Sequence, residues 1–145
     1  MQIINGSQFP TKVIPLIDSA KKSIKIVVFD WRWYPNDPDN PVQIFNQALV
    51  RAVRHGVKIQ AVANFDALIS TLNSLGIFAK KLIAKNLVHA KLMIIDDSIV
   101  ILGSHNYTQS AFTMNQEISV VLEELSASSV DEFNRFFNSL YNQNG

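Results

Sequence analysis

The sequence contains no cysteine, which excludes disulfide bonds and metal sites built on thiolate ligands. It also has no apolar run long enough to span a membrane. Its first residues lack the basic segment and following apolar stretch of a signal peptide, although a targeting segment trimmed from the N-terminus would leave no trace here. These absences predict a cytoplasmic protein without membrane spans.

Charged residues are also scarce, at 17% of the 145 residues, whereas 48% are hydrophobic. This length and composition predict a single globular domain, residues 1–145, with enough apolar side chains for a core. The net charge of +1 conceals an asymmetry, because residues 1–95 carry 12 Lys and Arg against 5 Asp and Glu, and residues 96–145 carry 1 against 7. The basic side chains either form a positive face suited to a phosphate backbone or lie scattered over a solvated surface.

Apolar runs and amphipathic segments alternate along the chain. The patterns predict strands at 23–29, 57–63, 88–96, 99–103 and 116–123, and helices at about 8–21, 41–55, 66–75 and 129–142. The pair Asn40-Pro41 is typical of a helix N-terminus, and Gly56 is typical of the residue that follows a helix C-terminus. Strand and helix alternation followed by a hairpin predicts an α/β fold, a mixed β-sheet flanked by helices on both faces.

A histidine and a lysine interrupt the apolar stretch that forms the predicted hairpin. His89 and Lys91 are two residues apart, so alternation along a strand places both side chains on the same face. Imidazole and ammonium groups are costly to bury without a partner. Their position therefore indicates that an anion binds between them.

The surrounding residues form a longer pattern with fixed spacing. The pattern His-x-Lys-x4-Asp-x6-Gly-Ser-x-Asn is formed by His89, Lys91, Asp96, Gly103, Ser104 and Asn106. It resembles the HKD signature of the phospholipase D superfamily, and the whole chain is similar to the small single-domain bacterial endonucleases of that superfamily. Members carry a glutamate about a dozen residues after the Gly-Ser pair, which corresponds to Glu117 here.

The motif residues suit attack on a phosphodiester, an anion that repels nucleophiles. Lys91, the Ser104 hydroxyl and the Asn106 amide are suited to hold the non-bridging oxygens and spread the charge of the transition state. His89 is the candidate nucleophile, forming a covalent phosphohistidine. A carboxylate on its other ring nitrogen would fix the tautomer, and Glu117 is the candidate for it, the alternative being an ordinary charge at a strand edge.

One histidine cannot both attack the phosphorus and protonate the leaving oxygen. The sequence holds a single copy of the motif. The resemblance therefore implies a homodimer with a composite active site on its two-fold axis, in which His89 of each chain flanks the phosphate.

Two residues of the motif are expected to act on the structure. Asp96 is an odd number of residues from His89, so alternation places it on the opposite face, where capping of the turn is the expected role. Gly103 is expected to allow the backbone to approach the phosphate closely, although a glycine required by a bulge would look the same.

The segment after the first predicted strand is rich in aromatic side chains. Trp31, Arg32 and Trp33 form a candidate substrate groove that stacks bases, and His105, the variable position of the motif, is a further candidate contact. The alternative for the two tryptophans is packing in the core or in a dimer interface. For His105 the alternative is exposure to solvent.

These observations predict a metal-independent phosphodiesterase without a cofactor, and specifically an endonuclease acting on DNA or RNA. Asp96 and Asp97 form a turn and not a cluster of carboxylates, and no zinc-type histidine spacing occurs. A phospholipase or phosphatidyl transferase is the alternative with the same chemistry, although no amphipathic membrane-binding segment is found. A nucleic-acid-binding module without turnover is the second alternative.

Overall fold

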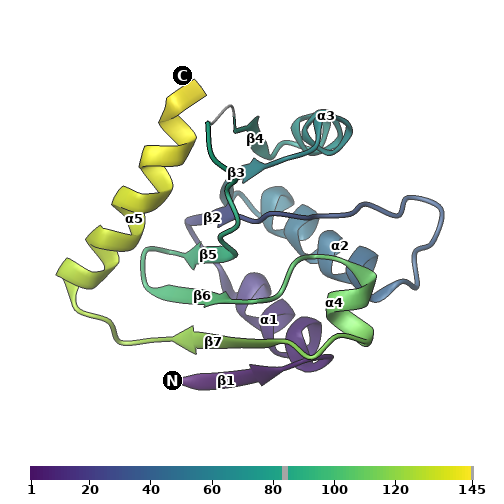
Figure 1. The fold of residues 1–145 in the computed structure, drawn as a ribbon, viewed down its shortest axis with the longest axis horizontal. Helices are drawn as coiled ribbons and strands as arrows, with labels where there is room; N and C mark the ends of the chain where they lie inside the picture. Colours follow the sequence, from purple (N-terminus) through teal and green to yellow (C-terminus); the bar gives the residue numbers. More distant parts are fainter. Residues whose placement is uncertain (83–84, 145) are drawn as a thin grey trace.

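One mixed sheet organises the protein. In the computed structural model, which describes residues 1–82 and 85–144, seven strands pair in the order β1-β7-β6-β5-β2-β3-β4 (Figure 1). The strands are β1 (Gln2–Asn5), β2 (Ser23–Val27), β3 (Lys58–Ala63), β4 (Phe78–Lys81), β5 (Leu92–Ile95), β6 (Ile99–Gly103) and β7 (Ile118–Leu122). The β2-β3 and β3-β4 pairs are parallel, and the other neighbours are antiparallel.

Helices cover both faces of the sheet, which confirms the predicted fold class. They are α1 (Gln8–Ser19), α2 (Pro41–Arg54), α3 (Asp66–Ser74), α4 (Gln109–Thr113) and α5 (Ala127–Tyr141), followed by a 3-10 turn at Asn142–Asn144. The first four contribute to one hydrophobic core, whereas α5 packs on the opposite face over β2 and β3 (Figure 1). The two helical layers bury the central strands from both sides, as expected for the parallel part of a sheet.

Local sequence signals explain where the longer elements begin and end. The Asn40 side chain accepts a hydrogen bond from the backbone N–H of Val42, and Pro41 occupies the first position of α2. Gly56 follows that helix with a φ of 88°, a conformation that favours glycine. The sequence patterns missed β1, β4 and α4, which are only four or five residues long and too short for a clear period.

The hairpin between β5 and β6 turns at Asp96 and Asp97, whose φ angles are 53° and 49°. The Asp96 carboxylate accepts hydrogen bonds from the backbone N–H groups of Lys21 (2.9 Å), Lys22 (2.7 Å) and Ser23 (3.0 Å). It therefore fastens the connection between α1 and β2 to the hairpin. This contact lies at the opposite end of β5 from Lys91.

Asp96→Asn is expected to lower the free energy of unfolding at neutral pH by about 1.5–3 kcal/mol, the usual contribution of hydrogen bonds to a charged group. Partial burial raises the pKa of Asp96, but hydrogen bonds from Ser23, Lys21 and Lys22 and the charge of Lys22 outweigh it, so the pKa lies below its usual value. The stabilisation is therefore present above the unfolded pKa of about 4 and is lost as pH falls through the folded pKa. Asparagine keeps the shape and tolerates positive φ, so urea unfolding at pH 7 and pH 3 isolates the charge. Equal losses at both pH values would contradict this account.

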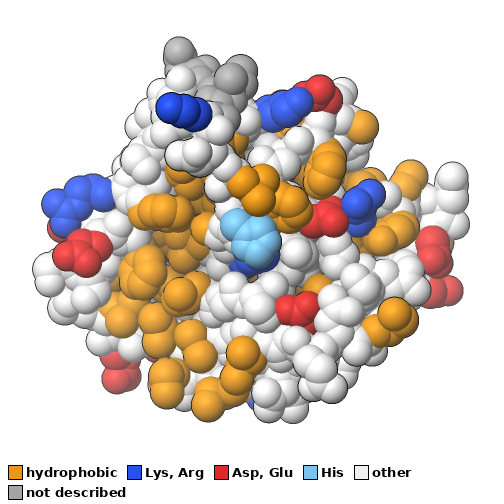
Figure 2. Space-filling view, in the orientation of Figure 1, with side chains coloured by type: hydrophobic (Ala, Val, Ile, Leu, Met, Phe, Trp, Pro, Cys, Tyr) orange, Lys and Arg blue, Asp and Glu red, His pale blue; other side chains and the backbone are white. Residues whose placement is uncertain are grey.

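Among the described residues, no helix covers the outer strands of the sheet on the side of α5. Alternation along β1, β6 and β7 points apolar side chains to this side, where Ile3 is 48% exposed and Ile118 is 56% exposed. The apolar face consists of Ile3, Leu102, Ile118 and Val120 from the strands and Phe136 from α5. Figure 2 shows hydrophobic side chains gathered on the surface between α5 and β7. Such an exposed cluster is typical of an interaction surface.

Candidate active site

His89 and Lys91 lie in an extended segment immediately before β5. The strand begins at Leu92, so the predicted strand beginning at residue 88 starts too early. The two side chains are nevertheless together, because the Lys91 Nζ atom lies 3.0 Å from Nδ1 and 3.2 Å from Nε2 of His89. The histidine is exposed and the lysine is half-buried, so the pair opens to the surface.

Phe29 forms the apolar wall beside this pair. Its ring centroid lies 5.1 Å from that of His89, and the Lys91 ammonium lies 5.9 Å from the same ring. Partial burial lowers the pKa of Lys91, and the negative charge of Glu117 opposes that shift. A partly desolvated cation of this kind favours an anionic ligand.

Asn106 is oriented by the backbone of the neighbouring β2–α2 segment. Its Oδ1 atom accepts a hydrogen bond of 3.0 Å from the Asp30 N–H. The Tyr107 N–H donates to the Asp30 carbonyl (2.9 Å), which fixes the two segments against each other. Since a backbone N–H only donates, the contact assigns the oxygen of the amide, and the Asn106 NH2 group is left to donate elsewhere.

Ser104 and Glu117 form a hydrogen bond with each other. The Ser104 hydroxyl donates to Glu117 Oε1 (2.5 Å) and accepts from the Ile118 N–H (3.0 Å). Asn115 donates to the other carboxylate oxygen of Glu117 (3.0 Å). Among the described residues of one chain, the hydrogen bonds of Glu117 therefore go to Ser104 and Asn115, and the predicted contact with His89 is not formed.

Gly103 is required by the packing of β6 against β7. A Cβ atom at this position would overlap the Cα and Oγ atoms of Ser119 and would lie 2.5 Å from the Ile118 carbonyl oxygen. The glycine therefore allows β6 to approach β7 closely, whereas the sequence predicted a close approach of the backbone to the phosphate. It also holds Ser104, the next residue, against β7.

The inclusion of His105 in the candidate substrate groove is corrected by the structure. The side chain is 1% exposed and stacks on Phe9 at 4.6 Å between ring centroids. Its Nε2 atom faces the Gly6 carbonyl at 2.8 Å, which only accepts, so Nδ1 accepts from the Ser119 hydroxyl at 2.7 Å. Burial lowers the pKa of His105, opposed by the Gly6 carbonyl and Glu117. The side chain is therefore part of the core next to the site and is not accessible to a substrate.

The aromatic segment is divided between the core and the surface. Trp31 is 1% exposed and donates from Nε1 to Asn46 (2.8 Å), so the core-packing alternative holds for this residue. Arg32 is exposed and Trp33 is half-buried. Sequence reasoning missed Phe65, whose ring lies 5.3 Å from the Arg32 guanidinium carbon, because nothing in the local sequence links the two segments.

Two negative findings apply to residues 1–82 and 85–144. No group of three or more His, Asp or Glu side chains in this part of the chain is placed to hold a metal ion. No helix there has the length and apolar character needed to cross a membrane.

Sequence and structure comparisons agree on the class of protein that this fold and motif define. The family model described as "Cardiolipin synthase, PLD-like domain" matches residues 13–141. Because this match includes most of the chain, the protein belongs to the phospholipase D-like family. A search of curated proteins finds no significant match.

Solved structures resemble the whole chain. Nuc, a phospholipase D family member from Salmonella typhimurium, is 26% identical with a TM-score of 0.82, over 98% of this chain and 93% of that chain. NucT from Helicobacter pylori is 20% identical with a TM-score of 0.73, over 96% and 93%. Phosphatidylserine synthase from Haemophilus influenzae is 16% identical with a TM-score of 0.73, and the similarity spans 97% of this chain but 36% of that chain.

Proposed function

We propose that the protein is a metal-independent phosphodiesterase, specifically an endonuclease that cleaves DNA or RNA through a phosphohistidine intermediate. The observation that carries this proposal is the contact of 3.0 Å between Lys91 and His89, with an oriented Asn106 amide on the neighbouring segment. A nucleophile beside fixed donors is the arrangement that phosphoryl transfer needs. Similarity to Nuc along nearly the full length of both chains supports the same class of small enzyme.

The proposed reaction has two displacements at phosphorus. A ring nitrogen of His89 attacks, the N–P bond forms, and the P–O bond to the leaving oxygen breaks as that oxygen takes a proton from a second, protonated histidine. Water then attacks the phosphorus and gives its proton to the second histidine, which is now neutral. The N–P bond breaks and His89 is released. Lys91 and Asn106 stabilise the oxygens that gain charge in both steps.

We further propose that the second histidine is His89 of the partner subunit in a homodimer. The apolar face lies beside the site, and a groove of about 630 Å³ between β6 and α5 is lined by both Lys91 and Phe136. Burial of this face against its copy would bring two sites together around one axis. A carboxylate for the second ring nitrogen of His89 would then come from Glu117 of the partner subunit or from a rearranged Glu117 in the same chain. A cytoplasmic location remains a prediction from the sequence.

Phosphatidyl transfer is the second candidate function, and specific observations favour it. The matching family model is described by a lipid enzyme, cardiolipin synthase, and an exposed apolar face lies next to the site. The same phosphohistidine chemistry would serve a lipid phosphodiester. The two candidates therefore differ in substrate and not in catalytic residues.

A single assay series compares the candidate functions. The protein is incubated with plasmid, single-stranded oligonucleotide and phosphatidylglycerol vesicles, each with and without EDTA. We expect cleavage of nucleic acid that EDTA leaves unchanged, and no turnover of lipid. Complete loss of activity with EDTA would contradict the phosphohistidine mechanism, lipid turnover alone would favour the second candidate, and binding without cleavage would favour a non-catalytic binding module.

A further inference from the structure

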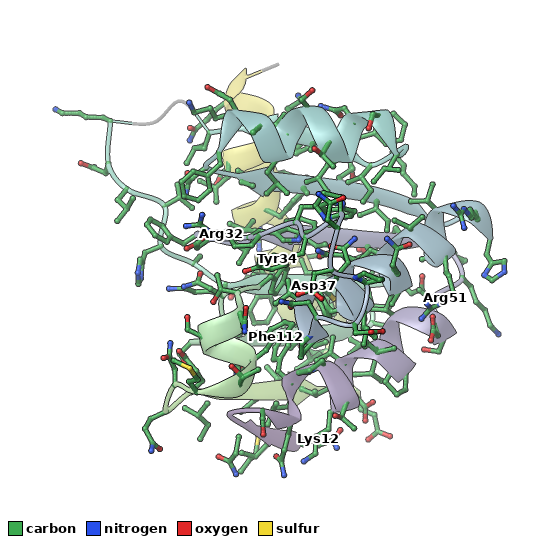
Figure 3. The ribbon with its side chains drawn as sticks, turned by 90° about the vertical axis from the view of Figure 1, so that its right-hand side faces the viewer. Lys12, Arg32, Tyr34, Asp37, Arg51 and Phe112 are labelled. Carbon is green, nitrogen blue, oxygen red and sulfur yellow. The ribbon has the colours of Figure 1, made fainter. Side chains whose placement is uncertain are left out.

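A recess lies between the segment that follows β2 and the start of α3. It has a volume of about 420 Å³, within the range of small-ligand sites. Its walls include Arg32, Trp33, Pro35 and Phe65. Figure 3 shows Arg32 between α3 and α4, on the side of the molecule where the β2–α2 segment passes.

Hydrogen bonds from α2 hold this wall in place before any ligand binds. Asn46 is fully buried and accepts from the Trp31 indole N–H (2.8 Å) while donating to the Arg32 carbonyl (3.0 Å). Gln43 accepts from the Tyr34 N–H (2.9 Å). Because both ends of the stretch from Trp31 to Tyr34 are fixed, little ordering of the backbone is needed on binding.

The recess is linked to the active site through adjacent residues of the segment that follows β2. Phe29 contacts His89, and the next residue, Asp30, orients Asn106. Arg32 follows two residues later, and its guanidinium group lies over the Phe65 ring. A strand whose phosphate sits at His89 would therefore place the base of an adjacent nucleotide near this recess.

The charge of Arg32 indicates which part of a nucleotide binds here. Its Nε and terminal nitrogen donate to the two Asp30 carboxylate oxygens, at 2.7 and 3.2 Å. This pairing holds the guanidinium plane in one orientation, so the group presents a flat surface to a ligand. It also offsets the positive charge of Arg32, so the side chain would bind a phosphate only weakly. Flat cations and aromatic rings are the surfaces on which unpaired bases stack.

We propose that the recess formed by Arg32, Trp33 and Phe65 binds an unpaired nucleobase next to the scissile phosphate, and so favours single-stranded nucleic acid. This inference rests on the proposed nuclease function. A paired base cannot offer its face to such a recess, because its faces are covered by neighbouring base pairs. Any of the common bases can stack on these side chains. The recess should therefore favour single-stranded over double-stranded nucleic acid without selecting a base sequence.

The test measures binding in a His89→Ala background, so that the ligand is not cleaved. Affinity is measured by fluorescence anisotropy for a short oligothymidylate and for an abasic strand of the same length. Phe65→Leu is expected to weaken binding of oligothymidylate by roughly 5- to 100-fold, the range for loss of one base stack, with little change for the abasic strand. Phe65→Trp should retain binding because it keeps an aromatic face.

Phe78 provides a matched control. It is 55% exposed and lies 5.9 Å from the Lys58 ammonium, the same kind of contact, but on β4 away from the recess. Phe78→Leu should leave both affinities unchanged. Equal effects of Phe65→Leu on the two strands, or no effect on either, would overturn the base site while wild-type cleavage of oligothymidylate still supports the nuclease. Absence of wild-type cleavage of any nucleic acid would instead overturn the proposed function itself.

Discussion

His89→Ala is expected to reduce kcat/KM for a phosphodiester substrate by on the order of 10⁴-fold or more, the scale seen when a nucleophile is removed. The loss should be large because, in the proposed dimer, the substitution would remove both the attacking and the protonating imidazole. The side chain is exposed, so the free energy of unfolding should change by less than about 0.5 kcal/mol. Initial rates and urea unfolding of the purified variant provide the two measurements.

The control for this variant is His55→Ala, since His55 is also exposed and lies at the end of α2. It should retain wild-type activity. A second readout is covalent: substrate labelled at the scissile phosphate should leave label on the wild-type protein after a rapid quench at high pH, and acid should remove it. Retention of label on the His89→Ala protein would show that another residue is the nucleophile.

Ile118→Glu is expected to convert a dimer to monomers and to reduce activity by about 100-fold or more at low protein concentration. The substitution places a charge in the apolar face, and burying an unpaired carboxylate at an interface is costly. Light scattering after size exclusion measures the oligomeric state, and activity is followed over a range of protein concentrations. We expect the activity to recover in part as the concentration rises.

Ile44→Glu is the matched control, because Ile44 is 46% exposed and lies on α2, which belongs to the other helical layer. It should leave mass and activity unchanged. A further measurement mixes wild-type and His89→Ala chains, where activity should fall with the square of the wild-type fraction if both histidines serve one phosphate. A linear fall, or a fully active Ile118→Glu monomer, would refute the composite site.

Local signals account for the parts of the fold that were predicted. The Asn40-Pro41 pair and Gly56 mark the ends of α2, because capping and positive φ depend on a few adjacent residues. The turn of the hairpin at Asp96 and Asp97 likewise depends on adjacent residues, so the sequence could predict it. The side-by-side placement of His89 and Lys91 also follows from their spacing, even though β5 begins after them.

Contacts between distant segments account for what the sequence did not indicate. His105 is buried by bonds to Gly6, 99 residues away, and to Ser119 on β7, and no local pattern encodes either partner. Asn115 and Ser104 donate hydrogen bonds to the Glu117 carboxylate. The contact with Ser104 depends on the register of β6 against β7, which the sequence alone does not give. Phe65 meets Arg32 only because β2 and β3 are adjacent and parallel.

The position of His89 and Lys91 just outside β5 separates chemistry from scaffold. Neither residue pairs with a neighbouring strand, because the pairing of β5 starts at Leu92. The other end of β5 is held by the hydrogen bonds of Asp96. Side chains at these two positions can therefore be exchanged over generations, or by an engineer, without dismantling the strands that hold them. The architecture therefore does not depend on the chemistry that these two side chains perform.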